Sequence, residues 1–259
     1  MGYTVSSSEK RLDEMVSIAA LIYRSPGYAD SLWRSLVETV PGLGRSIEFF
    51  FLANNATDQL LEHLQAKKYP HRVRREPIGR IPAEIQPLPY MIDVYRGWNE
   101  AIRQAAGKVI VLLNSDHVFT AHWLDSLLAV WKEEIAVSPL MVEPGPEHFR
   151  DSVNGTGSLI CDCGHHPSTF DRARFERFAE SATKDALTDG GVFMPVLISR
   201  AALLKVGLYP EGNIRSTDAC GCPGDQVLFG RLQSIGVRHV TCHRAICYHF
   251  MEGEMREGH

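Results

Sequence analysis

Apolar, strand-like runs alternate with amphipathic stretches along the first half of the chain, and this alternation restricts the fold more than any other feature of the sequence. Strands are expected at residues 16–23, at 47–52 and, most clearly, at 108–113. Polar turns and stretches in which apolar residues recur with a helical period lie between them. This order predicts an α/β fold in which helices cover both faces of a mostly parallel central sheet and ligands bind beyond the carboxyl ends of the strands.

Further elements are predicted from periodicity and from capping residues. Thr57 or Asn55 is expected to cap a second helix, and Ser199 to cap a short helix that runs to Val206. The other expected elements are helices at 28–40, 91–106, 171–187 and 226–235, a helix that carries Trp123 and Trp131, and strands at 72–75, 192–198 and 237–250. Irregular structure is expected in the proline-rich residues 77–89 and at 143–168, with a frayed tail at 251–259.

Composition indicates the kind of protein but not its activity. The 259 residues suit a single domain, and the 44% hydrophobic and 22% charged residues are ordinary for a folded, soluble protein. A formal charge of −4 gives no reason to expect a nucleic-acid partner. No secretory signal is recognisable, and no apolar run approaches the roughly 20 residues that span a bilayer. A cytoplasmic location without a transmembrane segment is therefore expected.

Four of the six cysteines form two Cys-x-Cys pairs, Cys161 with Cys163 and Cys220 with Cys222. Zinc sites more often use a two-residue spacer, so reduced thiols are the first interpretation. A zinc ion or disulfides that join the two pairs are the alternatives. Cys242 and Cys247 lie within an expected strand and are predicted to be small core residues.

A polar triplet, Asn114-Ser115-Asp116, follows the most clearly defined strand. The glycine-rich loops of dinucleotide-binding and P-loop proteins are missing from the sequence, so the usual phosphate cradles are excluded. A carboxylate at the end of a buried strand can hold Mg²⁺ or Mn²⁺ against a diphosphate. Considered alone, Asp116 is better explained by a turn or a helix cap.

The triplet has a longer context, because residues 99–107, the strand 108–113 and Asn114-Ser115-Asp116 together resemble the family 2 glycosyltransferases. Their pattern is Asn-x-Gly/Ala-Ile-x-x-Ala-x-Gly, a strand, and Asp-x-Asp. The resemblance implies one GT-A domain over residues 1–259, a Rossmann-like three-layer sandwich. Its nucleotide-binding part covers about 15–142 and its acceptor-binding part about 143–250.

The resemblance also implies roles for individual donor-site residues. Tyr23 matches the aromatic residue that packs on the nucleotide base, with a core tyrosine as the alternative. Ala53 replaces the carboxylate that usually reads the base, which leaves Asn54 to read it or to shape the turn. Asp116 falls on the metal-binding position, and His249, in a terminal Tyr-His, matches the histidine that completes the metal shell, with a surface or core histidine as the alternative. Four further positions join the implied nucleotide-sugar site: Asn99 and Asn114, which belong to the motif, and the paired Gly190 and Gly191.

On the acceptor side, Pro223-Gly224-Asp225-Gln226 resembles the start of the family's Glu-Asp-x-x-Leu-x-x-Arg-Leu helix. Asp225 matches the catalytic base, although a helix-capping role is the alternative, and Gly224 replaces the preceding acid. The implied activity is inverting transfer of a sugar from a nucleotide-diphosphate-sugar, with Mn²⁺ or Mg²⁺, to a glycan, lipid-linked or small-molecule acceptor. A sugar nucleotidyltransferase and a noncatalytic sugar-nucleotide or glycan-binding module are the competing hypotheses.

Overall fold

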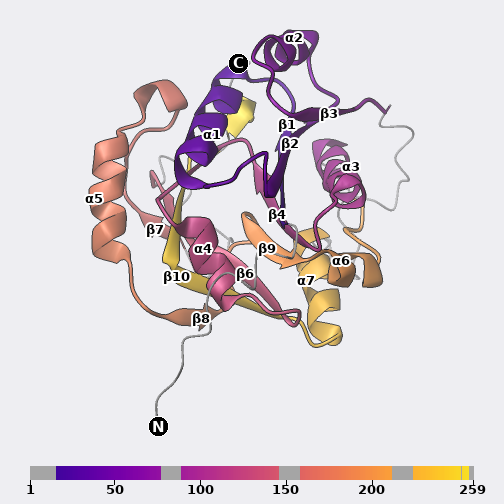
Figure 1. The fold of residues 1–259 in the computed structure, drawn as a ribbon, viewed down its shortest axis with the longest axis vertical. Helices are drawn as coiled ribbons and strands as arrows, with labels where there is room; N and C mark the ends of the chain where they lie inside the picture. The colour runs from indigo at the N-terminus through magenta and orange to yellow at the C-terminus, as the bar shows by residue number, and fades with distance from the viewer. Residues whose placement is uncertain (1–15, 77–88, 146–157, 212–223, 252, 257–259) are drawn as a thin grey trace.

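The computed structural model describes residues 16–76, 89–145, 158–211, 224–251 and 253–256. Within these ranges the chain forms one ten-stranded sheet in the order β3-β2-β1-β4-β9-β6-β10-β5, with β7 beside β6 and β8 beside β10 (Figure 1). The strands are β1 (Val16–Ile22), β2 (Ile47–Asn54), β3 (His71–Arg74), β4 (Val109–Asn114), β5 (His117–Phe119), β6 (Ile135–Glu143), β7 (Ser158–Ile160), β8 (Leu187–Asp189), β9 (Val196–Ser199) and β10 (Arg238–His249).

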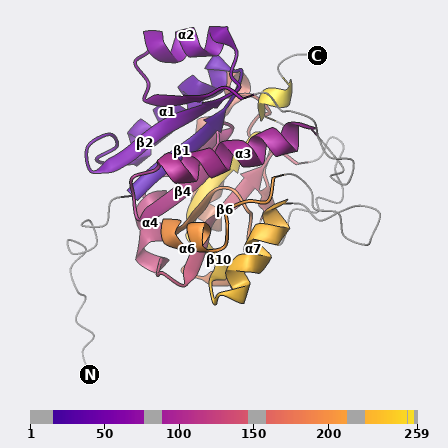
Figure 2. The same ribbon diagram turned by 90° about the vertical axis from the view of Figure 1, so that its right-hand side faces the viewer.

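Helices lie on both sides of this sheet (Figure 2). They are α1 (Pro26–Thr39), α2 (Asp58–Ala66), α3 (Pro89–Gln104), α4 (Trp123–Val130), α5 (Arg172–Ala182), α6 (Arg200–Lys205) and α7 (Gly224–Ser234), with short 3₁₀ turns at Pro167–Thr169 and Gly253–Arg256. Strands β3, β2, β1 and β4 are parallel, whereas β9 runs antiparallel to β4. The predicted α/β fold with a mostly parallel central sheet is confirmed.

The side chains of β1 alternate between two hydrophobic clusters, one on each face of the sheet. Ile18 and Ala20 point toward α1, α2 and α4, while Ala19 and Leu21 point toward α3, α6 and α7. Successive side chains of a strand face opposite sides of a sheet, so a strand covered on both faces is expected to be apolar at nearly every position. That requirement explains why the first strands could be recognised from the sequence.

Capping side chains define the starts of three helices. Thr57 accepts a hydrogen bond from the Leu60 amide at the start of α2, Ser25 accepts one from Tyr28 at α1, and Ser199 accepts one from Ala202 at α6. Each satisfies an amide that has no partner inside its helix. The predictions for Thr57 and Ser199 are confirmed.

Several predicted boundaries were wrong, most of them in the second half of the chain. The helix predicted at 171–187 ends at Ala182, because the chain turns at Thr183 and forms β8 against β10. The strand predicted at 192–198 begins only at Val196. Strand β6 was not predicted, and the tail is not wholly frayed, since Glu254 is only 4% exposed.

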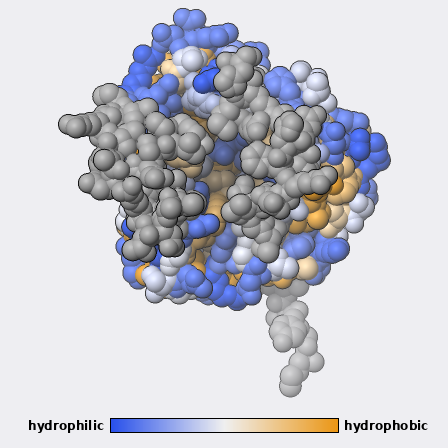
Figure 3. All heavy atoms as spheres, turned by 180° about the vertical axis from the view of Figure 1, so that it is seen from behind, coloured by the Kyte–Doolittle hydropathy of each residue, from blue (hydrophilic) through white to orange (hydrophobic). Residues whose placement is uncertain are grey.

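Three predictions lie wholly or mainly outside the described residues: the proline-rich loop at 77–89, the pair Cys220 and Cys222, and the acceptor segment before Asp225. Cys161 and Cys163 are free thiols whose sulfurs are 3.6 Å apart. Cys242 and Cys247 are buried free thiols, as expected. In the part of the chain that the structure describes, no helix combines the length and the apolarity needed to cross a membrane. Most of the described surface seen from behind is hydrophilic (Figure 3).

Candidate active site

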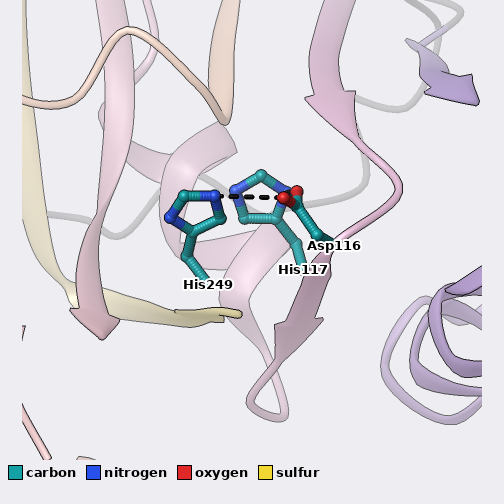
Figure 4. A group of neighbouring side chains, drawn as sticks. All are labelled: Asp116, His117 and His249. Atoms are coloured by element: carbon teal, nitrogen blue, oxygen red, sulfur yellow. Dashed lines mark ion pairs between the residues drawn. The ribbon is translucent and has the colours of Figure 1, made fainter. Parts of the chain in front are cut away.

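Three side chains converge where β4, β5 and β10 end or begin. Asn114 ends β4, and Ser115 and Asp116 form the turn into β5. Strand β5 is antiparallel to β10, with His117 directly opposite His249. Facing residues of neighbouring strands share a side of the sheet, so the two imidazoles stack with centroids 5.0 Å apart and planes 18° apart. Asp116 lies beside them (Figure 4).

The distances within this cluster suit a divalent cation. Nε2 of His249 is 3.2 Å from Oδ2 of Asp116, and Nδ1 of His117 is 3.4 Å from Oδ1. One ligand atom from each of the three residues lies within 4.8 Å of the others. Oδ1 of Asp116 and Nε2 of His117 are buried without a hydrogen-bond partner among the described residues. One carboxylate and two imidazoles form a donor set that fits Mn²⁺ or a related ion.

Glu143, the last residue of β6, orients His249 from the other side. Its Oε1 is 2.9 Å from Nδ1 of His249, and β6 runs parallel to β10. A carboxylate on the second ring nitrogen fixes the orientation of the imidazole and leaves the first nitrogen for a ligand. The structure therefore provides both a candidate ligand and the group that holds it in place.

Charge is shared unequally within the cluster. Burial opposes the charge on His249, but Asp116 and Glu143 outweigh it and raise the pKa of His249 to about 10. Burial likewise opposes ionisation of Asp116, but His249 lowers the pKa of that carboxyl to about 2. His117 is different, since burial lowers its pKa to about 4. The described structure thus holds an imidazolium between two carboxylates, with a neutral imidazole stacked on it.

The segment after β10 folds back onto this cluster. Gly253 has a positive φ of 39°, and a Cβ atom there would lie 2.3 Å from Oδ2 of Asp116, so only glycine fits. The next residue, Glu254, accepts hydrogen bonds from the amides of Tyr23, Arg24 and Ser25 and from the Ser115 hydroxyl. Burial raises the pKa of Glu254 to about 7 despite these four donors. Its carboxyl joins the end of β1 to the end of β4.

Glu254→Ala is expected to lower the free energy of unfolding by about 3 kcal/mol, because it leaves two buried and two partly buried donors without their shared acceptor. Urea denaturation followed by circular dichroism measures the change. Glu62→Ala is the matched control, since Glu62 is exposed on α2, and it should have little effect. Equal stability of the two variants would show that the Glu254 contacts are dispensable.

Two predicted donor-site residues lie at the ends of β1 and β2. The Tyr23 amide donates to Glu254 at 3.1 Å, and the Arg24 guanidinium lies 4.8 Å from the centre of the Tyr23 ring. Asn54 is buried, with its amide nitrogen 2.9 Å from the Asp93 carbonyl and its oxygen 2.7 Å from Arg74. Its side-chain hydrogen bonds thus reach neighbouring protein groups, and its role in reading a base stays a prediction.

The remaining predicted donor-site residues are spread over three regions. Asn99 makes paired hydrogen bonds of 2.9 Å with the main chain of Tyr209. The Asn114 carbonyl lies 3.1 Å from Nδ1 of His117. Gly190 and Gly191 have φ values of 79° and 152° beside β10, and a Cβ on Gly191 would lie 2.4 Å from the Thr241 hydroxyl. Their roles in nucleotide-sugar binding also stay predictions.

Asp225 lies in the first turn of α7, on the face of the sheet that α3 also covers. Its Oδ2 accepts a 2.8 Å hydrogen bond from the Tyr95 hydroxyl of α3. Burial raises the pKa of Asp225 to about 6, although this hydrogen bond acts in the opposite direction. Among the described residues Asp225 makes no hydrogen bond or ion pair with Asp116 or His249. The structure thus brings Asp116 and His249 into contact, while the participation of Asp225 in the same site stays a prediction.

Sequence reasoning missed His117, Glu143, Glu254 and Tyr95. His117 follows Asp116 directly, and a short strand that pairs with the terminal strand would have been the signal for it. Glu143 ends an apolar run, which is a recognisable pattern, but its proximity to His249 depends on the pairing of β6 with β10. The sequence contains no signal that brings Glu254 back to β1 or Tyr95 to Asp225.

Comparison with solved structures identifies the class of fold. No family model and no curated protein matches the chain. Similar structures include GalNAc-T7 with UDP, GalNAc and Mn²⁺ (TM-score 0.54), S. aureus TarS (0.56), and the mannosyltransferase PcManGT from Pyrobaculum calidifontis in complex with GDP-Man and Mn²⁺ (0.51). Each is 14% identical to this chain and aligns with 91% of it.

The chain accordingly has the GT-A fold of these glycosyltransferases. It spans 44% of the length of GalNAc-T7, 60% of TarS and 56% of the mannosyltransferase. At this level of identity the likeness defines the architecture. What the protein does must be argued from the residues of its own site.

Proposed function

We propose that the protein is an inverting, metal-dependent glycosyltransferase of the family 2 type that uses a nucleotide-diphosphate-sugar donor. The observation that carries this proposal is the cluster of Asp116, His117 and His249 at the carboxyl end of β4, with two buried ligand atoms that have no hydrogen-bond partner among the described residues. In α/β sheets, ligands bind beyond the carboxyl ends of the strands. The fold and the donor set therefore indicate the same chemistry.

Asp116 and His249 would hold the cation, and the stacked His117 offers a third ligand. Mn²⁺ or Mg²⁺ bound there would neutralise the negative charge of the diphosphate as it leaves. The two imidazoles favour Mn²⁺ over Mg²⁺, because Mg²⁺ prefers oxygen ligands alone. Glu143 would keep the ring of His249 directed at the site.

Asp225 would act as the general base. Its carboxylate takes the proton from the acceptor hydroxyl, whose oxygen forms a bond to the anomeric carbon of the donor sugar. The bond from that carbon to the diphosphate breaks, and the leaving group departs from the opposite face, which inverts the configuration. A carboxyl with a pKa of about 6 suits this role, because it is ionised at neutral pH and is still a stronger base than an exposed aspartate.

The donor and acceptor are proposed only as classes. GalNAc-T7 was solved with UDP and the mannosyltransferase with GDP-Man, and the hydrogen bonds of Asn54 to Arg74 and Asp93 do not indicate which base this chain would bind. We assign donor binding to residues of about 15–142 and acceptor binding to residues of about 143–250. The proposed acceptor is a glycan, a lipid-linked molecule or a small molecule.

Thermal-shift measurements with UDP, GDP, ADP and CDP, each with and without Mn²⁺, test the nucleotide site, since stabilisation scales with the occupancy of the native protein. Mn²⁺-dependent stabilisation by at least one diphosphate is expected. Release of free sugar from the matching donor then separates an enzyme from a noncatalytic module, which would bind without turnover. A nucleotidyltransferase would instead form nucleotide-sugar from nucleoside triphosphate and sugar phosphate.

Turnover should depend on pH through Asp225. The raised pKa means that this carboxyl takes up a proton as the pH falls through about 6, and a protonated carboxyl cannot accept the acceptor proton. The rate constant kcat/KM is expected to fall about tenfold per pH unit below about 6 and to be level just above it. Donor hydrolysis between about pH 4.5 and 8 measures the profile. An acid limb near the ordinary pKa of aspartate, about 4, would contradict this assignment.

A further inference from the structure

Tyr95 of α3 contacts Asp225 at two points. The Tyr95 hydroxyl donates a hydrogen bond of 2.8 Å to Oδ2 of Asp225. The oxygen of the same hydroxyl accepts a hydrogen bond of 3.3 Å from the Asp225 amide. The two residues are 130 positions apart in the chain, so the contact depends on the packing of α3 beside α7. One phenol thereby fixes both the side chain and the main chain of the proposed base.

Gly224 explains how the tyrosine comes this close. A Cβ atom at Gly224 would lie 2.7 Å from Cε2 and Cζ of the Tyr95 ring, closer than such atoms approach in proteins. The resemblance to family 2 places an acid at this position, and here the tyrosine ring fills the space that an acidic side chain would need. The departure from the family pattern is therefore matched by a new neighbour for Asp225.

The ring of Tyr95 is itself held in place. It stacks on Tyr209 with centroids 5.3 Å apart and planes 20° apart, and Trp98 packs beside both rings. Asn99 fixes the Tyr209 main chain through two hydrogen bonds. Tyr95 is fully buried, so few alternative orientations of its hydroxyl remain.

One carboxylate oxygen of Asp225 has no hydrogen-bond partner among the described residues. Oδ1 is buried and has no hydrogen-bond partner in the described parts of the chain, whereas Oδ2 is engaged by Tyr95. A buried carboxylate oxygen without a donor is unfavourable unless a ligand supplies one. The hydroxyl of an acceptor is such a donor.

We propose that Tyr95 is the positioning residue of Asp225: it holds Oδ2 and so presents Oδ1 to the acceptor hydroxyl. This inference rests on the proposed glycosyltransferase activity, in which Asp225 is the base. In the family pattern an acid precedes the base, and in this chain Gly224 stands there instead. The hydrogen bond from Tyr95, which belongs to a different helix, orients Asp225 in its place. The hydrogen bond from Tyr95 also lowers the pKa of Asp225, which burial alone would raise further.

Tyr95→Phe is the decisive variant, because it removes the hydroxyl and keeps the ring against Gly224. Tyr209→Phe is its matched control, since Tyr209 is the stacked neighbour and its buried hydroxyl has no hydrogen-bond partner among the described residues. We expect Tyr95→Phe to lower kcat about 10- to 100-fold, as for a lost hydrogen bond to a charged group, with donor KM within about twofold. Tyr209→Phe should leave both constants within about twofold.

A second measurement keeps the test independent of turnover. The Asp225 carboxyl carbon can be titrated by NMR in the wild type and in both variants, with Asp225→Asn to assign the signal. Tyr95→Phe should raise the pKa of Asp225 relative to the wild type, and Tyr209→Phe should not. An unchanged pKa, or equal losses of kcat in the two phenylalanine variants, would overturn the role of Tyr95. If the wild type turns over no donor, the proposed activity fails, and the titration still decides whether Tyr95 controls Asp225.

Discussion

Asp225→Asn is expected to lower kcat by about 100- to 10,000-fold, the range that removal of a general base produces. Asparagine keeps the shape of the side chain and can still pair with the Tyr95 hydroxyl, but its amide cannot accept the acceptor proton. Affinity for the nucleoside diphosphate should change by no more than about twofold, because the proposed donor contacts lie elsewhere. Steady-state kinetics and calorimetric titration of the diphosphate measure the two effects separately.

The control for this variant is Asp125→Asn, on the exposed surface of α4, where the side chain is 67% accessible. It removes the same charge from the protein and should leave kcat unchanged. If Asp225→Asn turned over the donor at the wild-type rate, Asp225 would not be the base. If it lost diphosphate affinity as strongly as rate, Asp225 would belong to the donor site instead.

Asp116→Ala should produce the largest loss of metal affinity, about 100-fold or more for Mn²⁺, because it removes the only carboxylate of the described ligand cluster. It also removes one of the two carboxylates that raise the pKa of His249, which makes that imidazole easier to deprotonate, but neutral imidazoles cannot replace the negative charge of the lost carboxylate. Both the rate and the Mn²⁺-dependent binding of diphosphate should fall. Calorimetric titration with Mn²⁺ alone measures the first quantity without any donor.

Glu143→Gln provides a graded comparison. Glutamine can still hydrogen-bond Nδ1 of His249 but lacks the negative charge, and partners of metal ligands typically change affinity about 10- to 100-fold. Its effect should therefore lie between those of the wild type and Asp116→Ala. Mn²⁺ affinity that is identical in all three proteins would remove the cluster from metal binding and leave the three residues as a buried charge network.

The first half of the fold could be predicted because its strands are buried on both faces and its helices carry clear caps. Strand β1 is apolar at nearly every position, and Thr57 marks the start of α2 with a local hydrogen bond. Such features depend only on near neighbours in the chain. The rest of the fold depends on long-range pairing, and β5, β7 and β8 contain only three residues each, too few for a period to be recognised.

Strand β6 was missed for a different reason. Pro139 lies in its middle, and a proline within an apolar run argues against a central strand because it has no amide hydrogen for the ladder. Here Pro139 is the last residue paired with β10 before the break between Cys242 and Ile246, so the missing amide hydrogen lies next to an existing interruption of the pairing. The sequence of β6 can be recognised as a strand only when its pairing with β10 is known.

Some residues of the candidate site could be predicted from local sequence motifs, and the others depend on long-range contacts. Asp116 and His249 were found because the motif marks their positions, and the structure brings them to 3.2 Å. His117, Glu143 and Glu254 reach the same place through strand pairing and through the return of the chain after β10, which no local pattern encodes. Tyr95 could not have been predicted, since it compensates for Gly224 from another helix.

The break in β10 decides which ring meets the aspartate. Cys242 is level with Pro139, and Ile246 is level with Leu140, so three residues of β10 have no counterpart in β6. Side chains at 240 and 242 belong to one core cluster, which continues at 245 and 247, whereas 246, 248 and 250 face the other. An odd number of extra residues reverses the alternation. The length of this short insertion, rather than the identity of its residues, therefore determines whether an imidazole or a phenol is turned toward Asp116.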